Sequence, residues 1–483
     1  MKGLKEQTLF GVAWNFLEIF GSKGSQIITT LLLAWYLVPN DYALVAMIAV
    51  FIALSAAIVD GGLGQALIRK VTVTETELNT VFWVNILVAS MWYAAIFLAA
   101  PLVADFYEEP QLALLLQCVS LSVFFQAASV IPKVVLNRAL HFKQQMQATL
   151  PASVLSSLLA IILAYWGCGV WALIAQIVSN ACLIFIFLCY KQSWRPARQF
   201  DYYELKSLWK FAKYIILDGL LAIPFQNMYL IVLPKFFTVT TVGLYFFAMK
   251  ALEMLSALVT QAVVNVTFPA LSQIQDDPER LKLAYRKLVS SITFLSFPLL
   301  CFIAALAPLL FTLFLPEKWA NAAGYFQLMA LGGILYPLAA VNLIIMKVKG
   351  KSHLLFYVGL FKKAIAVCIF VYTIQLDSIE AVLWGYVVAV SLSYLPNVYY
   401  SYQLIGYTMV EQVIDFLPQL ILTFVISALI LAGVNGGFLT TYWDVCWVTV
   451  SAIFGYVALA SVLGIPGARK MITVIVNRTH AIK

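Results

Sequence analysis

Five ionisable residues lie inside long apolar stretches of the sequence: Glu18, Lys23, Asp218, Lys250 and Glu253. A charge at the centre of a lipid bilayer costs about 2.5–3.5 kcal/mol on insertion scales. Such residues are therefore held against a partner or a wet cavity, and they mark pathways for ions or polar molecules. The pattern predicts that these five side chains are turned away from lipid.

Polar side chains on two of these stretches share one helical face. At about 100° per residue, the polar residues of 10–37 fall within about 160° and those of 241–266 within about 180°. The first stripe holds Asn15, Glu18, Ser22, Lys23, Ser25, Gln26, Thr29 and Thr30, and the second holds Lys250, Glu253, Ser256, Thr260, Gln261 and Asn265. Gln226 and Asn227 lie beside the helix-disturbing Pro224. Together they predict a hydrated central cavity.

Within this cavity, we expect Lys23, Gln26, Gln226, Asn227 and Lys250 to contact substrate, and Glu18, Asp218 and Glu253 to form a charge or coupling network. Simpler interpretations stay open. Lys250 and Glu253 are three residues apart on a helix and can simply neutralise each other. Asp218 lies near the start of its stretch, where it can reach the headgroup level.

The composition indicates that these residues belong to a membrane protein. Of 483 residues, 63% are hydrophobic and only 11% are charged, against about 45–50% and about 25% in soluble domains. Most of the surface must face lipid, which excludes a soluble enzyme, a nucleic-acid binder and a secreted disulfide scaffold. The seven cysteines form no C-x-x-C pair and are predicted to be buried, unpaired thiols. The three histidines have no ligand spacing, so we expect no metal, cofactor or catalytic residue.

A membrane-spanning helix needs about 20 mostly apolar residues, and fourteen stretches meet this requirement. In chain order, spans 1 to 14 are 10–37, 42–66, 79–103, 112–132, 149–166, 169–190, 213–234, 241–266, 288–314, 321–346, 354–376, 380–402, 413–434 and 443–465. The sequence therefore predicts an all-α polytopic membrane protein. The first stretch is too long for a cleavable signal peptide and contains Glu18 and Lys23, so we expect a retained helix.

The basic residues predict the orientation. Most of the 30 lysines and arginines fall in the connectors on the side of both termini, whereas only Lys235 and Lys318 fall on the other side. Positive connectors stay in the cytoplasm, so both termini are expected there, with anionic lipids against the basic connectors. Asp201 to Glu204 reads as a capping box that starts an interfacial elbow helix, and Asp277-Pro278 starts a second one.

A weak internal repeat appears at an offset of 200 residues. It pairs Glu18 with Asp218, Gln26 with Gln226, Leu33 with Leu233 and Leu44 with Leu244. The repeat predicts an N-lobe at 1–190, a basic linker at 191–212 and a C-lobe at 213–402. Two further helices and a cytoplasmic tail occupy 403–483. Six helices per lobe make the copies parallel, with a substrate site between lobes that rock against each other.

Several motifs resemble the polysaccharide-transport branch of the MOP superfamily, the Wzx-type lipid-linked oligosaccharide flippases, above all exporters of the colanic-acid and lipopolysaccharide type. They are Asp60-Gly-Gly-Leu-Gly64 with Ile68-Arg-Lys70, the LNTVFWVN segment at 78–85, Phe268-Pro-Ala270 with Ile274-Gln-Asp-Asp277, and Glu317-Lys-Trp319 with Gln327-Leu328. The resemblance implies MATE-like lobes and contacts from Lys23 and Lys250 to pyrophosphate or acidic sugars. Asn227 matches an asparagine common in such proteins. An arginine often found near the outer end of span 1 is Trp35 here, with Lys235 as its repeat counterpart.

The function that this resemblance implies is export without catalysis. Undecaprenyl-diphosphate-linked oligosaccharide units would cross the bacterial inner membrane by alternating access, for lipopolysaccharide or exopolysaccharide biosynthesis. A proton or sodium ion would be a possible coupling partner, polysaccharide polymerase machinery a possible protein partner, and a monomer would suffice. One alternative is a cation-coupled drug antiporter of the same superfamily, with Glu18 and Asp218 as ion sites. A polysaccharide polymerase or ligase is disfavoured, because the outer connectors are short and contain no His or Arg.

Overall fold

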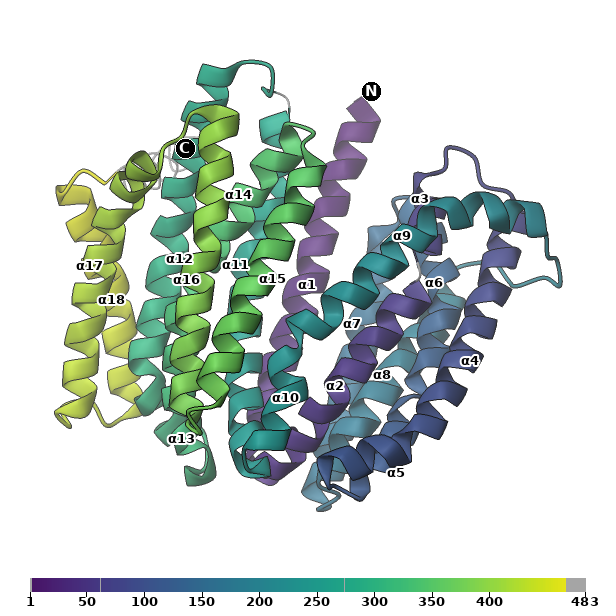
Figure 1. Ribbon diagram of the computed structural model, residues 1–483, viewed down its shortest axis with the longest axis horizontal. Helices are drawn as coiled ribbons and strands as arrows, with labels where there is room; N and C mark the ends of the chain where they lie inside the picture. Colours follow the sequence, from purple (N-terminus) through teal and green to yellow (C-terminus); the bar gives the residue numbers. More distant parts are fainter. Residues whose placement is uncertain (1, 61, 273, 466–483) are drawn as a thin grey trace, which may run out of the picture. The chain divides into compact units, whose positions relative to one another are not determined.

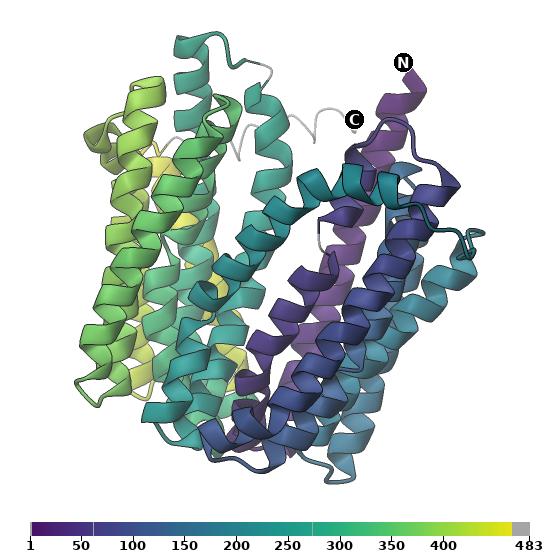
Figure 2. The same cartoon turned by 45° about the vertical axis from the view of Figure 1, so that its right-hand side comes forward.

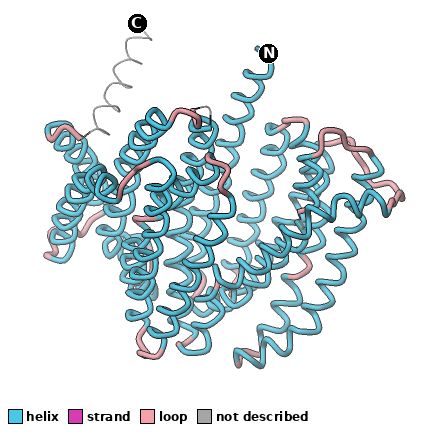
Figure 3. Tube along the Cα trace, turned by 45° about the horizontal axis from the view of Figure 1, so that its top comes forward, coloured by secondary structure: helices cyan, strands magenta, loops and turns pink. Residues whose placement is uncertain are grey.

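The computed structural model describes residues 2–60, 62–272 and 274–465, without side-chain surroundings for 2–13, 15–17, 19–20, 60, 211, 258–270 and 352. Helices make up almost all of this part, and no strand occurs in it (Figure 3). Contacts between residues divide the chain into two compact units, Met1–Phe246 and Phe247–Lys483, and each is considered by itself. The boundary between the two units falls inside one long helix. The predicted all-α class is confirmed.

The first unit contains ten helices in its described part and the start of another, which are labelled in Figure 1. They are α1 (Lys2–Tyr36), α2 (Pro39–Asp60), α3 (Leu63–Arg69), α4 (Glu75–Tyr107), α5 (Gln111–Val119), α6 (Ser122–Arg138), α7 (Phe142–Tyr165), α8 (Val170–Lys191), α9 (Tyr202–Gln226), α10 (Met228–Phe236) and the start of α11 (Val239–Ser272). The second unit continues α11. It adds α12 (Pro278–Phe314), the 3₁₀ turn η1 (Glu317–Trp319), α13 (Ala320–Gly333), α14 (Tyr336–Val348), α15 (Ser352–Ile374), α16 (Ile379–Ile405), α17 (Met409–Asn435) and α18 (Tyr442–Val462).

Every predicted span falls on one of these helices or on two consecutive ones. Twelve spans in the described residues are long and apolar enough to cross a membrane, so the chain is a multi-pass membrane protein. The two other predicted spans coincide with α1 and α11, which include side chains outside the described set. The count of fourteen therefore stays a prediction, and so do the lobe boundaries at 191–212.

Four predicted spans are built from two pieces each: α2 with α3, α5 with α6, α9 with α10, and α13 with α14. The break before α3 depends on Gly62, whose φ of 64° lies in the left-handed region. A Cβ on Gly62 would also lie 2.8 Å from the Cβ of Ile215 in α9. Only glycine meets both conditions at this position without strain.

The predicted caps exist, but they start long helices instead of short elbows. Asp201 accepts hydrogen bonds from the backbone of Tyr203 and Glu204, and α9 then runs on continuously to Gln226. Figure 2 shows this helix bending along its length. Its inner face packs on protein, since Leu208 and Ala212 are buried. The apolar span of membrane length begins only at Ala212, so the interfacial position of residues 201–212 stays a prediction. Asp277 likewise caps α12 by accepting a hydrogen bond from Arg280 N.

Small and aliphatic side chains fill the core of each unit. In the first unit a cluster that includes Leu67, Val81, Ile131 and Ala212 joins α3, α4, α6 and α9. Large apolar side chains such as Leu98 and Phe454 are more than two-thirds exposed, as expected for surfaces that face lipid. All seven cysteines are free thiols, but Cys368 and Cys446 are exposed on such surfaces, so the prediction that all seven are buried is wrong.

Candidate functional site

The polar stripe of α1 contacts α7 through its carboxylate. Thr149 of α7 donates a 2.9 Å hydrogen bond to Glu18 Oε1. The second oxygen, Oε2, is buried and makes no hydrogen bond to a residue that the structure describes. Gln145, one turn before Thr149, also has a buried Oε1 without such a partner. A buried acceptor without a donor is costly, so Glu18 Oε2 and Gln145 Oε1 are two buried oxygens that can each accept a further hydrogen bond.

Lys23 lies five residues after Glu18 on α1 and is half-buried. Its ammonium group is 3.5 Å from Gln26 Oε1, and the Gln26 side chain is exposed. Thr29 and Thr30 instead bond to backbone carbonyl groups of α1 itself. Lys23 and Gln26 therefore form a polar pair that a ligand can reach. The Asn15 side chain lies outside the described set.

Span 7 is interrupted at Asn227. Both its backbone N–H and its side-chain amide donate to the carbonyl of Ile223, at 3.0 and 2.9 Å. Asn227 O then accepts the first hydrogen bond of α10, from Ile231 N. Pro224 lies one turn earlier, inside α9. Interrupted membrane helices form substrate and ion sites in many transporters, because they leave backbone groups available. Gln226 and Asp218 are exposed on α9.

Lys250 and Glu253 form the ion pair that their spacing allows. The Lys250 ammonium group is 2.7 Å from Glu253 Oε2, and the two side chains keep exposed fractions of 38% and 56%. The pair is thus both neutralised and open on one side. The side chains of Thr260, Gln261 and Asn265, predicted to continue this stripe, lie outside the described residues. Lys250 belongs to the second unit and Lys23 to the first, so their sharing one cavity stays a prediction.

Lys235, the repeat counterpart of Trp35, is held by the C-terminal end of α4. Its ammonium group is 2.6 Å from Glu108 Oε1 and donates to the Phe106 carbonyl at 3.1 Å. Trp35 itself is 56% exposed. Neither position therefore offers an unengaged cation in the described structure.

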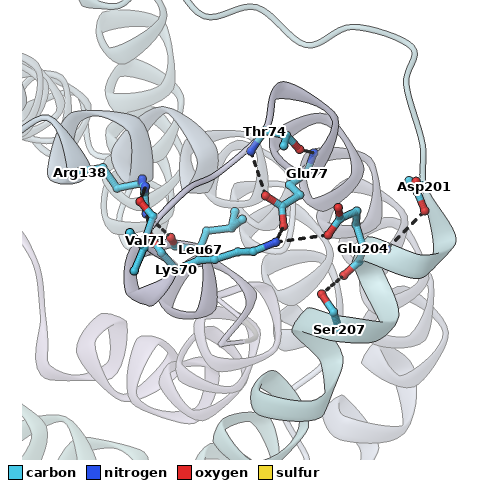
Figure 4. A network of polar contacts seen from close by, with 9 residues as sticks. All are labelled: Leu67, Lys70, Val71, Thr74, Glu77, Arg138, Asp201, Glu204 and Ser207. Carbon is cyan, nitrogen blue, oxygen red and sulfur yellow. Dashed lines mark hydrogen bonds and ion pairs between the residues drawn. The ribbon is translucent and has the colours of Figure 1, made fainter.

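The structure contains a charged network that the sequence did not single out, shown in Figure 4. Lys70 forms an ion pair with the fully buried Glu77 of α4 and lies 3.3 Å from Glu204 of α9. Thr74 and Glu77 cap the start of α4 reciprocally. The hydrogen bond from Lys70 to Glu77 raises the pKa of Lys70 above its usual range. Arg138 completes the network by donating to the carbonyls of Leu67, Lys70 and Val71.

Residues of the LNTVFWVN motif hold the linker that precedes α9. Asn79 Oδ1 accepts a 2.9 Å hydrogen bond from Ala197 N, and Thr80 accepts one of 3.0 Å from Asp201 N. Trp83 donates to the Ala197 carbonyl at 2.9 Å. This motif therefore fixes the connection between spans 6 and 7.

A threonine followed three residues later by glutamate, as in Thr74 and Glu77, was the one signal in the sequence that could have indicated the neighbouring cap.

The second unit has a comparable clamp between α12 and α17. Arg286 binds the carboxylate of Asp415 with two hydrogen bonds of 2.7 Å each, and Tyr407 donates to the same group at 2.7 Å. Lys282 lies 2.8 Å from Glu411. Bidentate arginine pairs fix geometry as well as charge.

Among the described residues, no three His, Cys, Asp or Glu side chains gather as a metal site.

Comparison with known proteins identifies the family. The family described as "Polysaccharide biosynthesis protein" matches residues 32–324, which is more than half of the chain. The chain belongs to this family. The predicted resemblance is thereby confirmed at the level of polysaccharide biosynthesis proteins.

Curated relatives and solved structures agree with this family. The chain is 27% identical to the succinoglycan biosynthesis transport protein ExoT of Rhizobium meliloti, over 77% of this chain and 76% of that protein. It is 23% identical to the lipopolysaccharide biosynthesis protein WzxC of Escherichia coli, over 74% and 73%. Its fold is similar to that of the lipid II flippase MurJ, with a TM-score of 0.75, 14% identity and coverage of 96% and 100%. A MATE family transporter of the MOP superfamily follows, with a TM-score of 0.60, 15% identity and coverage of 80% and 95%.

Proposed function

We propose that this family member is a flippase that moves undecaprenyl-diphosphate-linked oligosaccharide units across the bacterial inner membrane, from the cytoplasmic to the periplasmic leaflet. The observation that carries the proposal is the set of ionisable and amide side chains on the membrane helices. The relatives of the chain, which include a succinoglycan biosynthesis transport protein, support it. A saccharide–diphosphate head needs polar walls, while its lipid tail stays in the bilayer. The substrate would serve the synthesis of a surface polysaccharide.

In this mechanism Lys23 and Lys250 provide the positive charge for the diphosphate. The Lys23–Gln26 pair and the Lys250–Glu253 pair are each partly exposed, so a ligand oxygen can approach both ammonium groups. Asn227, Gln226 and the interrupted span 7 supply amide and backbone groups for sugar hydroxyls. No bond in the substrate is broken, and the protein works as a carrier with both termini in the cytoplasm. Its lobes, 1–190 and 213–402, would rock to expose the site alternately.

Glu18 is the candidate coupling residue. Its buried Oε2 lacks a hydrogen-bond donor in the described structure, which a proton or a sodium ion would satisfy. The same feature favours a second candidate function, a cation-coupled antiporter of small molecules. The two functions differ in what a deletion strain loses. Loss of surface polysaccharide supports the flippase, whereas drug sensitivity with normal polysaccharide supports the antiporter.

The direct experiment follows labelled lipid-linked units in inverted vesicles from a deletion strain, with and without the restored gene. We expect the label to reach the vesicle lumen only when the protein is present. Equal translocation in both preparations would contradict the proposal. Vesicles that carry a variant with an unrelated surface change, Lys206→Gln, serve as the expression control, because Lys206 is exposed on α9.

A further inference from the structure

A cavity of about 550 Å³ lies in the first unit, below the linker between α8 and α9. Its wall is formed by the first turns of α4 and α7, the end of α6, the last residue of α8 and the linker residues 192–195 and 197. This volume falls within the range of about 300–1,000 Å³ that is usual for sites of small ligands. Lys23, Gln26, Gln226 and Asn227 do not line it, so it is separate from the proposed substrate contacts.

The charged groups on the wall favour an anion. Lys191 and Arg195 both line the cavity and are exposed, and Glu75 has the one carboxylate among the lining residues that the structure describes. Arg195 is fixed in place, because its Nη1 donates to the carbonyls of Gln192 and Trp194 at 2.8 and 2.9 Å. Its Nε and Nη2 make no hydrogen bond within the described part of the chain. Those two nitrogens match the oxygens of a phosphate group.

Uncharged polar groups on the wall suit hydroxyl groups. Gln192 is buried, and its Oε1 accepts no hydrogen bond from the described residues. Its Nε2 makes one long contact of 3.3 Å, to the Trp194 carbonyl. A ligand hydroxyl that donates to Oε1 would satisfy this buried oxygen. Glu75 offers a second acceptor.

The surface beside the cavity is apolar and open. On α8, Tyr190 is 82% exposed and Ile186 is 49% exposed, which is typical of a surface that contacts lipid chains. A ligand with acyl chains would thus place its head in the cavity and its chains along α8. Basic pockets at the ends of membrane helices bind lipid headgroups in this way. A soluble phosphate ester would have the same polar contacts but none along α8.

We propose that this cavity binds one anionic phospholipid whose headgroup carries hydroxyl groups, with the phosphodiester against Lys191 and Arg195 and the hydroxyls against Gln192 and Glu75. Bound lipid would also stabilise the linker, because Trp194 and Ala197 line the cavity while Phe82 and Asn79 of α4 hold them. The lipid is a resident ligand of the folded protein and is not transported.

Native mass spectrometry and thermal unfolding of the purified full chain test this proposal. The probes are phosphatidylglycerol, phosphatidic acid, phosphatidylethanolamine and glycerol 3-phosphate. We expect one tightly bound phosphatidylglycerol and the largest rise in Tm with that lipid. The double variant Lys191→Gln/Arg195→Gln should bind it at least about tenfold more weakly. The matched double variant Lys206→Gln/Lys210→Gln removes the same charge from exposed positions on α9 that do not line the cavity, and it should bind normally.

Three results would overturn the proposal. Equal loss of binding in both double variants would show a diffuse charge effect instead of a site. If phosphatidic acid stabilised the protein as much as phosphatidylglycerol does, the headgroup hydroxyls would play no part in binding. If glycerol 3-phosphate did so, the acyl chains would play no part. A variant of the amide, Gln192→Leu, gives an independent check. This variant should weaken the binding of phosphatidylglycerol more than the binding of phosphatidic acid, since only phosphatidylglycerol carries headgroup hydroxyls.

Discussion

The Thr240 hydroxyl group donates a 2.8 Å hydrogen bond to the side-chain oxygen of Asn40, and the two residues are 200 positions apart. That separation is the offset of the internal repeat. The first turn of α2 thus contacts the first turn of α11, at the end of the helices that is predicted to face the periplasm. Next to this bond, Gly243 approaches the backbone of Pro39. In the alternating-access account, these two turns must separate when the site opens outward.

Gly243→Ala tests how close the two turns are. A Cβ at this position would lie 1.8 Å from the Pro39 carbonyl oxygen and 2.5 Å from its carbon, so the backbone has to move. Overpacking of this kind costs about 1–3 kcal/mol, and we expect a lower Tm in detergent. Gly359→Ala is the control, because a Cβ on Gly359 meets nothing within 4 Å. An unchanged Tm for Gly243→Ala would show that the turns are not in contact.

Cross-linking the turns tests whether they separate during transport. Cysteines at positions 40 and 240, joined by a short bis-methanethiosulfonate reagent that reacts with both thiols, should stop export, and reduction of the resulting disulfides should restore it. Each single-cysteine variant, treated in the same way, controls for reaction at the seven native thiols. Full export by the cross-linked protein would mean that the outer turns stay together throughout the cycle.

The Lys70–Glu77 pair predicts a compensating double variant. Lys70→Met leaves the fully buried Glu77 carboxylate without its cation, which should lower stability by about 2–4 kcal/mol. Glu77→Gln keeps a side chain that can cap α4 with Thr74, so Lys70→Met/Glu77→Gln should recover most of the loss. Thermal unfolding of the four proteins forms a double-mutant cycle. Strictly additive effects would contradict a direct interaction between the two groups.

Glu18→Gln tests the coupling role. The amide keeps an acceptor for Thr149 but cannot bind a proton or a cation as a carboxylate does. We expect export in vesicles to lose its response to an imposed pH or sodium gradient, while membrane insertion stays normal. Thr149→Val removes the hydrogen bond and keeps the carboxylate, so its response should persist. An identical gradient response in wild type and Glu18→Gln would show that Glu18 does not take part in coupling.

The membrane helices could be predicted from the sequence because each one requires its own apolar stretch of about 20 residues. Pro224 also indicated a disturbance in span 7, although the helix breaks three residues later, at Asn227. The pairing of Lys70 with Glu204 could not be predicted, because 134 residues separate them. The same holds for the packing of α9: Leu208 and Ala212 have the pattern of an interfacial helix, and only tertiary contacts bury them in protein.

The central claim, that Lys23 and Lys250 contact the charged head of a lipid-linked saccharide, is tested most directly by a flipping assay in proteoliposomes. Labelled undecaprenyl-diphosphate-linked units are reconstituted with wild type, Lys23→Ala/Lys250→Ala or the surface control Lys206→Ala/Lys210→Ala, at equal protein content. We expect the double variant of the membrane lysines to flip at least about tenfold more slowly, which corresponds to a loss of about 1.4 kcal/mol of stabilisation, and the control to match wild type. Equal flipping rates for all three proteins would contradict the account.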